Sequence, residues 1–436
     1  MINIYTLTSP LHDPAKIERI SEDFLGSIFP EGYYHLAGDD FSTYGEGNLD
    51  LIFVRTGGTE GRFLQVIPDL YKRGCREFLL LTSGGNNSLA ASMEILSFLG
   101  KAGLKGEILH GSPAYIRGRI DTLLQVRKAR TRLQGLRLGV LGDPSDWLIA
   151  SDADPDVIRE ELGIELVGIP MPAVQDAVAK APTAEAPLSS EVVGQAAPEV
   201  RSALPGAMQI RQGLESILRG YRLDGFKLRC FDLLKTIGNT GCLALADFNA
   251  RGIPAGCEGD IPSLLSMTLA KAVSGHTGFM ANPSRIDPDT GEIVFAHCTV
   301  PLDIVDQVKL DTHFESGIGI GIKGHFPEQD VTVFKVAGDL SAAFIAEGRL
   351  IRNLDERELC RTQVVVKLDD PSLTRTYFLR GPVGNHHIII PGRWKSVLEA
   401  VLPQRHHCCG GGGHGGHGHG HGEGHGHGGG CCGHHH

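Results

Sequence analysis

The sequence predicts an α/β protein with two parallel-sheet α/β domains followed by an antiparallel β-rich domain. Three observations support this prediction. Strand-like apolar runs alternate with helically spaced segments up to about residue 274, short β-type runs replace them from about residue 276, and residues 406–436 contain no aliphatic side chain. We therefore expect domains at 1–133, 134–274 and 275–405, followed by a disordered tail of His, Gly and Cys at 406–436.

The first domain shows the alternation typical of βαβ units. Its strand-like runs are INIYTL, LDLIFVRTGG and EFLLLTSGG, and helical spacing occurs at 13–28, 61–73, 87–101 and, in a basic segment, 115–134. Such alternation favours a parallel sheet covered by helices. Functional groups in these sheets collect at the carboxyl ends of the strands, where TGGTE (56–60) and SGGNNS (83–88) fall.

The second domain repeats this alternation with less regular spacing. We expect strands at 136–142, 164–171 and 227–234, helices at 154–162, 206–222, 242–252 and 261–274, and a loose helix or loop over 173–200. The segment 254–260 is predicted to lead from a strand into a loop. Its acidic residues therefore lie at the amino end of the last helix.

The third domain contains short runs rich in Val, Ile, Phe and Thr. They occur at 292–300, 315–324, 331–338, 360–368, 375–381 and 386–392, separated by Gly, Pro and Asp turns. No helical pattern between them is long enough to connect parallel strands. We therefore expect an antiparallel sheet or barrel.

Length, charge and cysteine use exclude several classes of protein. A chain of 436 residues is too long for one compact core, and a net charge of −10 disfavours nucleic-acid binding. No apolar run reaches the roughly 20 residues of a membrane-spanning helix, and the start resembles no secretory signal, so we expect a cytoplasmic protein. The six cysteines before the tail show no CxxC spacing and are expected to be reduced thiols.

The most informative segment is IPAGCEGD, in which Glu258 and Asp260 stand two residues apart between a strand and a helix. Carboxylates at such a position can converge on one site, and oxygen ligands suit Mg²⁺ or Mn²⁺. Asp260 is equally well placed to cap the following helix. The spacing alone leaves both interpretations open.

Histidines supply a second group of candidates. His386 and His387 lie in a Gly/Asn turn before an apolar strand, where adjacent side chains point to opposite sides, so one of them can reach a metal or substrate while the other packs. His297 and the pair His313 and Glu315 stand at predicted strand ends, either lining the same cavity or serving as polar strand-edge groups. The glycines of GIGIGIKG alternate along a strand, which excludes a dinucleotide loop.

Seven segments occur in an order that resembles the L-fucose/L-arabinose isomerase family, in particular its shorter fucose isomerase-like branch. They are GLRLGVLGDPSDWLI, NARGIPAGCEGD, FMANPSRID, HCTVP, THFESGIGIGI, CRTQ and GNHH. The resemblance covers about residues 1–400 and implies two Rossmann-like domains followed by a β-barrel-like domain. It also implies a homo-oligomer that interconverts aldoses and ketoses of small-molecule sugars using a divalent cation, commonly Mn²⁺.

The resemblance also implies roles for individual residues. It places the metal on Asp260, His386 and Glu258. It makes His387 either a support for these ligands or a contact to a sugar hydroxyl, and it makes His297 and Arg285 contacts to the sugar. Glu258 is the expected general base, because moving a carbonyl from C1 to C2 requires a proton to leave C2 and return to C1 through an ene-diolate. The sequence departs from the family at one point: a glutamate expected about two dozen residues before this loop is replaced by Cys242 or a neighbour, and Asp247 is the only acid nearby.

The tail suggests a separate metal-binding function. Residues 406–436 hold 11 of the 20 histidines, 4 of the 10 cysteines and 15 glycines, a composition that can bind Ni²⁺ or Zn²⁺ without fixed geometry. The candidate ligands are His414, His417, His419, His421, His425, His427, Cys431 and Cys432. A purification tag is the alternative for the final histidines, although the paired cysteines are unusual in a tag.

Three functional classes follow from these observations. The first is a metal-dependent sugar isomerase. The second is a catalytically altered relative that binds or converts another carbohydrate, which the missing glutamate favours. The third is a metal storage or delivery protein, which only the tail favours.

Overall fold

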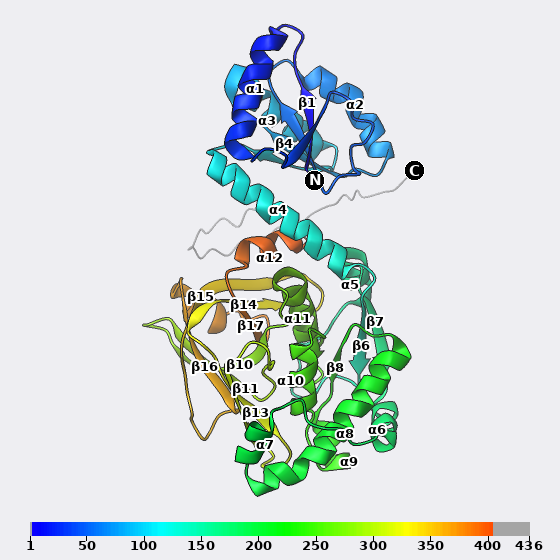
Figure 1. Ribbon diagram of the computed structural model, residues 1–436, viewed down its shortest axis with the longest axis vertical. Helices are drawn as coiled ribbons and strands as arrows, with labels where there is room; N and C mark the ends of the chain where they lie inside the picture. The colour runs from blue at the N-terminus through cyan, green and yellow to red at the C-terminus, as the bar shows by residue number, and fades with distance from the viewer. Residues whose placement is uncertain (1, 404–436) are drawn as a thin grey trace, which may run out of the picture. The chain divides into compact units, whose positions relative to one another are not determined.

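The computed structural model describes residues 2–403, so the candidate ligands of the tail lie outside the described residues. Figure 1 shows the order of the helices and strands along the chain. Within residues 2–403 no helix combines the length and the apolar character that crossing a membrane requires.

The amino-terminal part is a five-stranded parallel sheet with the strand order β2-β1-β3-β4-β5. Its elements are β1 (Ile2–Leu7), α1 (Pro14–Ile28), β2 (Tyr34–Gly38), β3 (Leu49–Val54), α2 (Glu60–Lys72), β4 (Glu77–Leu81), η1 (Gly85–Asn87), α3 (Ser88–Lys101), β5 (Lys105–Leu109) and α4 (Pro113–Leu133). Every residue of the central strand β3 is buried, as its unbroken apolar run predicts. The edge strands β2 and β5 were not predicted, because partly exposed sequences such as YHLAG and KGEIL carry no such run.

The second parallel sheet has the order β7-β6-β8-β9. Its elements are β6 (Arg137–Leu141), α5 (Pro155–Leu162), β7 (Glu165–Ile169), α6 (Met171–Lys180), α7 (Ser190–Gln195), α8 (Pro198–Tyr221), β8 (Gly225–Leu228), α9 (Phe231–Ile237), α10 (Cys242–Ala250), β9 (Ala255–Gly256) and α11 (Ile261–Ser274). The predicted strand 227–234 is wrong in its second half: β8 ends at Leu228, and the apolar residues from Phe231 onward follow helical spacing in α9. The segment 173–200 contains α7 and parts of α6 and α8.

The third part is a closed antiparallel barrel with the strand order β10-β11-β16-β15-β14-β17, which confirms the predicted fold class. Its elements are β10 (Phe279–Asp287), β11 (Glu292–His297), the β12 (Gln307–Asp311) and β13 (Gly321–His325) hairpin, β14 (Gln329–Val336), β15 (Ala343–Asn353), β16 (Thr362–Leu368), η2 (Thr374–Phe378), β17 (His387–Pro391) and α12 (Lys395–Val401).

One of the expected strands in this part is wrong, and another is right only in its last four residues. The segment 375–381 lies in the π-helical turn η2 and the residues after it, where Thr374 and Phe378 point inward at a spacing of four. The segment 315–324 is extended only from Gly321 onward. The eleven-residue strand β15 was not predicted, because charged residues and Gly348 interrupt its apolar positions.

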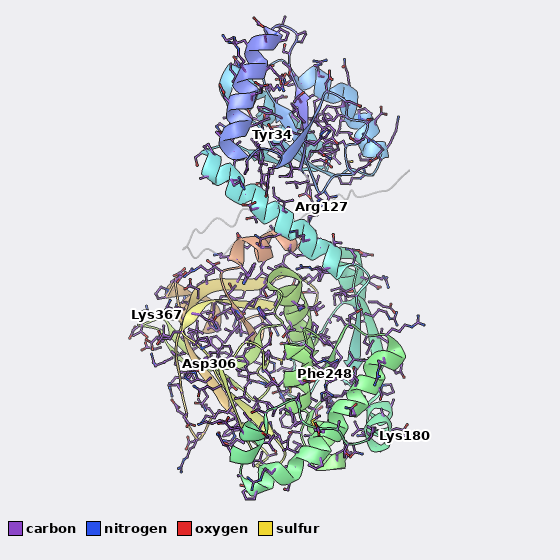
Figure 2. All side chains as sticks on the ribbon, in the orientation of Figure 1. Tyr34, Arg127, Lys180, Phe248, Asp306 and Lys367 are labelled. Atoms are coloured by element: carbon purple, nitrogen blue, oxygen red, sulfur yellow. The ribbon has the colours of Figure 1, made fainter. Side chains whose placement is uncertain are left out.

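Helix α11 connects the second sheet to the barrel. It contacts β8 and β9 on one side and β14 and β17 on the other, and eleven of its residues are buried (Figure 1). Phe248 of the neighbouring helix α10, labelled in Figure 2, packs edge-on against Phe226 of β8 at 5.3 Å between ring centres. The loop that precedes α11 therefore lies where the carboxyl ends of β8 and β9 meet the barrel.

Candidate metal centre

Three side chains from distant parts of the chain converge beside the amino end of α11. Glu258 lies in the loop between β9 and α11, His297 ends β11, and His386 immediately precedes β17. Oε1 of Glu258 lies 3.6 Å from Nε2 of His297 and 3.6 Å from Nε2 of His386. One donor atom from each residue lies within 4.8 Å of the other two.

These separations suit ligands of one ion better than direct hydrogen bonds. A distance of 3.6 Å is long for a hydrogen bond, whereas two atoms each about 2.1 Å from an ion at a tetrahedral angle lie about 3.4 Å apart. Nε2 of His386 is buried and has no hydrogen-bond partner among the described residues. A buried polar atom without a partner is costly, and a bound cation would satisfy it. The residues therefore fit a metal ion.

The burial and neighbours of Glu258 and His386 shift the pKa of both side chains. Burial alone would raise the pKa of Glu258, but the imidazoles of His297 and His386 hold this pKa well below its usual range. Burial alone would lower the pKa of His386, but the hydrogen bond to Asp260 and the negative charge of the nearby Glu258 carboxylate raise this pKa to about 9. The centre therefore holds a carboxylate at neutral pH.

Asp260 lies behind His386, on the side away from Glu258. Its carboxylate is fully buried and caps α11 by accepting from the Ser263 backbone N–H at 2.8 Å, so the helix-cap interpretation is confirmed. It also accepts from the Ser263 hydroxyl at 2.7 Å and from Lys335 Nζ at 3.2 Å, and Oδ2 lies 2.8 Å from Nδ1 of His386. Burial would raise the pKa of Asp260, but Lys335 and His386 hold this pKa well below its usual range. Asp260 thus contacts one candidate ligand and stays ionised.

His387 and Arg285 lie apart from this cluster. The His387 ring is buried among Phe295, Phe344 and Phe378, with Nε2 2.9 Å from the Tyr377 hydroxyl. The two adjacent histidines point to opposite sides, as strand geometry requires. Arg285 is half-exposed and forms an ion pair with Glu356 at 2.7 Å.

Trp147 is a component of the centre that the sequence analysis missed. Its indole Nε1 donates to Oε2 of Glu258 at 2.7 Å, and Ser145 N–H donates to the Glu258 carbonyl at 3.0 Å. The Trp147 ring packs edge-on against Phe231, and Phe231 packs edge-on against His313. The turn DPSDW after β6 was the available signal, because it falls at the carboxyl edge of the second sheet.

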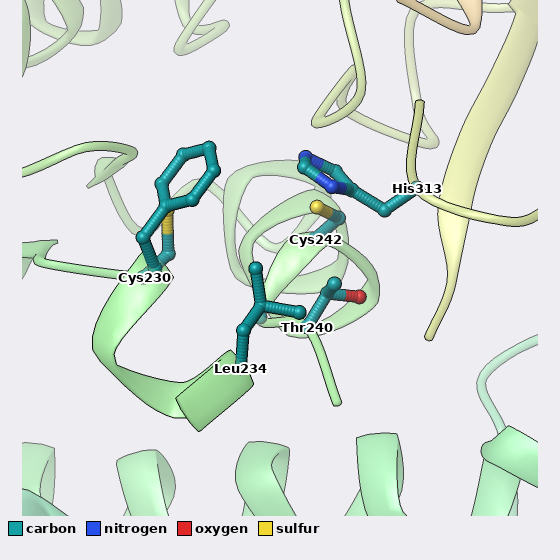
Figure 3. Close-up of a pocket in the computed structure, with 7 residues that line it drawn as sticks. Cys230, Leu234, Thr240, Cys242 and His313 are labelled. Carbon is teal, nitrogen blue, oxygen red and sulfur yellow. The ribbon is translucent and has the colours of Figure 1, made fainter. Parts of the chain in front are cut away.

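A small pocket lies beside this aromatic series. It is lined by Cys230, Phe231, Leu234, Thr240, Gly241, Cys242 and His313, and Figure 3 shows side chains from separate segments facing one another across it. Burial lowers the pKa of His313 to about 4, so this imidazole is neutral at pH 7.

Comparison with known proteins gives one relationship. No family model matches the chain. The chain is distantly similar to sulfoquinovose isomerases. Those of Priestia aryabhattai and Priestia megaterium (strain ATCC 12872 / QMB1551) are each 22% identical to it over 225 residues, which is 49% of this chain and 50% of each relative. The chain thus spans about half the length of the curated relatives it matches.

The similarity to sulfoquinovose isomerases supports a relationship to sugar isomerases, but not the narrower resemblance to the fucose isomerase-like branch. A glutamate of that branch was expected at Cys242 or a neighbour, and Cys242 lines the pocket and is buried. Asp247 forms an ion pair with Arg211 at 2.7 Å and does not belong to the Glu258, His297 and His386 cluster. No lining residue of the pocket is acidic, so neither residue supplies the missing carboxylate.

Proposed function

We propose that this protein is a metal-dependent sugar isomerase that interconverts an aldose and a ketose. The observation that carries the proposal is the cluster of Glu258, His297 and His386, in which Nε2 of His386 is buried without a hydrogen-bond partner among residues 2–403. The similarity to sulfoquinovose isomerases over half of each chain supports the same activity.

In this proposal Glu258, His297 and His386 hold a divalent cation. Two imidazoles and one carboxylate bind Mn²⁺ and also suit Zn²⁺, Co²⁺ and Fe²⁺, and we propose Mn²⁺ as the working ion. A bound cation supplies positive charge that stabilises the ene-diolate formed from the sugar. Asp260 orients His386 through Nδ1 and so directs Nε2 toward Glu258.

The proton transfer is assigned to Glu258, and a contact to the sugar is assigned to His313. Glu258 is the proposed base and acts through Oε2, the oxygen that accepts from Trp147, because Oε1 faces the two imidazoles. It removes the C2 proton and returns it to C1. His313 lines the pocket as a neutral imidazole and is proposed to hydrogen-bond a sugar hydroxyl.

The second candidate function is that of a carbohydrate-binding or otherwise altered relative. Two observations favour it: the resemblance places a glutamate where this chain has Cys242 or a neighbour, and no residue that lines the pocket is acidic. Such a protein would bind a sugar and the cation without exchanging the C2 proton. Metal storage, the third candidate, depends on residues 406–436 alone.

Solvent exchange of the C2 proton tests the proposal. Full-length protein is stripped with a chelator, reloaded with Mn²⁺ and incubated in D₂O with the aldoses sulfoquinovose, fucose and arabinose, while ¹H NMR follows the C2 proton signal of each aldose. We expect loss of this signal with at least one sugar, and its retention in His297→Ala and His386→Ala. His276→Ala is the matched control, because His276 is exposed and pairs with Asp303 outside the cluster. Protein that binds Mn²⁺ but exchanges no proton with any sugar would support the second candidate instead.

A further inference from the structure

Two buried thiols lie in contact next to the candidate metal centre. Sγ of Cys230 and Sγ of Cys257 are 3.1 Å apart, and both side chains are buried. Cys257 directly precedes Glu258, and Cys230 directly precedes α9. We propose that Cys230 and Cys257 form a redox-active dithiol, which hydrogen peroxide converts to a disulfide that withdraws Glu258 from the metal centre.

The positions of the two residues in the second sheet bring the sulfur atoms together. Strands β8 and β9 are parallel neighbours, with Phe226 opposite Ala255 and Lys227 opposite Gly256. Their carboxyl ends therefore lie side by side, and Cys230 and Cys257 follow just beyond them. A disulfide requires sulfur atoms about 2.05 Å apart, so closure demands a movement of about 1 Å.

Only one of the two sulfur-bearing residues lines the pocket. Cys230 contributes to the pocket wall, whereas Cys257 does not (Figure 3). Cys242 also lines the pocket, so peroxide entering it meets Cys230 and Cys242 before Cys257. This access assigns Cys230 as the attacking thiol and Cys257 as the resolving thiol.

The oxidation balances with hydrogen peroxide as the only co-reactant. The Cys230 sulfur attacks one peroxide oxygen, the O–O bond breaks, and a sulfenic acid and one water are formed. The Cys257 sulfur then attacks the sulfenic sulfur, forming the S–S bond and releasing the hydroxyl as a second water. Two thiols lose two hydrogen atoms and peroxide is reduced to two waters. A small-molecule dithiol such as dithiothreitol reverses the reaction by exchange.

The disulfide would act on the metal centre through the backbone. Glu258 follows Cys257 in a left-handed conformation, with φ of 57°, so its position depends closely on that of its neighbour. A pull on Cys257 moves Glu258, whose Oε1 lies 3.6 Å from each imidazole nitrogen. Metal ligands tolerate errors of only about 0.2 Å in bond length, so the oxidised form should bind the cation more weakly. This consequence rests on the proposed metal function, whereas the dithiol chemistry does not.

Peptide mapping of full-length protein tests the dithiol directly. Reduced, metal-free protein is treated with one equivalent of hydrogen peroxide, free thiols are blocked with N-ethylmaleimide, and the digest is analysed for a Cys230–Cys257 cross-link. We expect this cross-link, its loss on dithiothreitol treatment, and its absence in Cys230→Ser and Cys257→Ser. Cys75→Ser is the matched control and should keep the cross-link, because Cys75 lies in the first sheet's domain. Oxidation that joins other cysteines and leaves Cys230 and Cys257 free would overturn the proposal.

A parallel titration with Mn²⁺ tests the coupling to Glu258. We expect the oxidised protein to bind Mn²⁺ at least about tenfold more weakly than the reduced protein, with recovery after dithiothreitol. A Cys230–Cys257 cross-link that leaves the Mn²⁺ affinity unchanged would overturn the coupling. Reduced protein that binds no Mn²⁺ at Glu258, His297 and His386 would instead reject the proposed metal function, and the peptide map would still decide the dithiol.

Discussion

Nδ1 of His386 lies 2.8 Å from Oδ2 of Asp260, and both side chains are fully buried. Because the Asp260 carboxylate is a hydrogen-bond acceptor, this contact places a proton on Nδ1 and turns Nε2 toward Glu258. The other contacts of Asp260, to Ser263 and Lys335, fix the carboxylate in this position. One residue therefore caps α11, neutralises a buried lysine and orients a candidate ligand.

Replacing Asp260 by Asn should weaken metal binding while keeping the helix cap. An amide oxygen can still accept from the Ser263 backbone, but it orients His386 less strongly than a carboxylate does. We expect the Mn²⁺ affinity of Asp260→Asn to fall about 10- to 100-fold, measured by calorimetric titration. Unfolding in urea should also show a loss of about 3 kcal/mol, because Lys335 keeps a buried charge without its partner.

A double variant separates these two effects. In Asp260→Asn/Lys335→Met the unpaired charge is gone, so we expect stability to recover while the Mn²⁺ affinity stays low. Recovery of both quantities together would mean that Asp260 acts only through folding.

Trp147 is expected to affect the reaction more than the fold. Trp147→Phe keeps an aromatic ring against Phe231 but removes the N–H that donates to Glu258. A hydrogen bond to a charged group contributes roughly 1.5–3 kcal/mol, and because Trp147 is half-exposed we expect the lower end, about a tenfold loss in kcat/KM.

Trp394→Phe is the matched control for this prediction, because the Trp394 indole donates to the Pro391 carbonyl and contacts none of the three clustered residues. Steady-state kinetics on the sugar found active in the proton-exchange assay make the comparison. Equal losses in the two variants would show that Trp147 has no specific role at Glu258.

Local sequence patterns predicted a helix or strand correctly where several independent signals marked the same bounds. Helix α11 was predicted at its observed bounds because Asp260 caps it, Pro262 stands in its first turn and Gly275 ends it. Strand β15 was missed and 375–381 was wrongly taken as a strand, because barrel closure buries residues that carry no continuous apolar run. Tertiary packing determined the structure of both segments, and local patterns in a single sequence do not predict such packing.

For the candidate site, the sequence predicted several of the residues that take part but not how they are arranged. Four residues were recognised as candidates because each is polar and stands at the end or start of a predicted strand or before a helix: Glu258, Asp260, His297 and His386. The sequence did not predict how these residues are arranged. His297 was expected beside the sugar, whereas it clusters with Glu258 and His386. Asp260 was expected on the metal, whereas it contacts Nδ1 of His386, on the side away from Glu258. Trp147 was missed because its contact depends on the pairing of two loops 111 residues apart in sequence.

Removal of residues 406–436 should separate two metal-binding activities. The histidines and cysteines of the tail are expected to bind Ni²⁺ or Zn²⁺, while the proposed catalytic ion depends on Glu258, His297 and His386. Protein ending at residue 405 should therefore lose the Ni²⁺ and Zn²⁺ that the tail binds in addition to the one ion held by this cluster, measured by equilibrium dialysis, but keep its C2 proton exchange. Loss of that exchange on truncation would contradict separate roles.

Lys227 gives a prediction for the pH dependence of stability. Its side chain is fully buried on β8 and donates to the Gly142 carbonyl at 2.5 Å, and burial lowers its pKa to about 8 from an ordinary value of 10.5. Between these two pH values the unfolded chain binds the proton more strongly than the folded chain, so stability rises with pH. We expect wild-type protein to gain up to about 3 kcal/mol relative to Lys227→Met between pH 8 and 10.5, measured by urea unfolding of metal-free protein. The control is Lys128→Met, at an exposed position on α4, whose free energy of unfolding should change with pH in parallel with that of the wild type. If the curve of Lys227→Met is also parallel to that of the wild type, the buried amine does not titrate in this pH range.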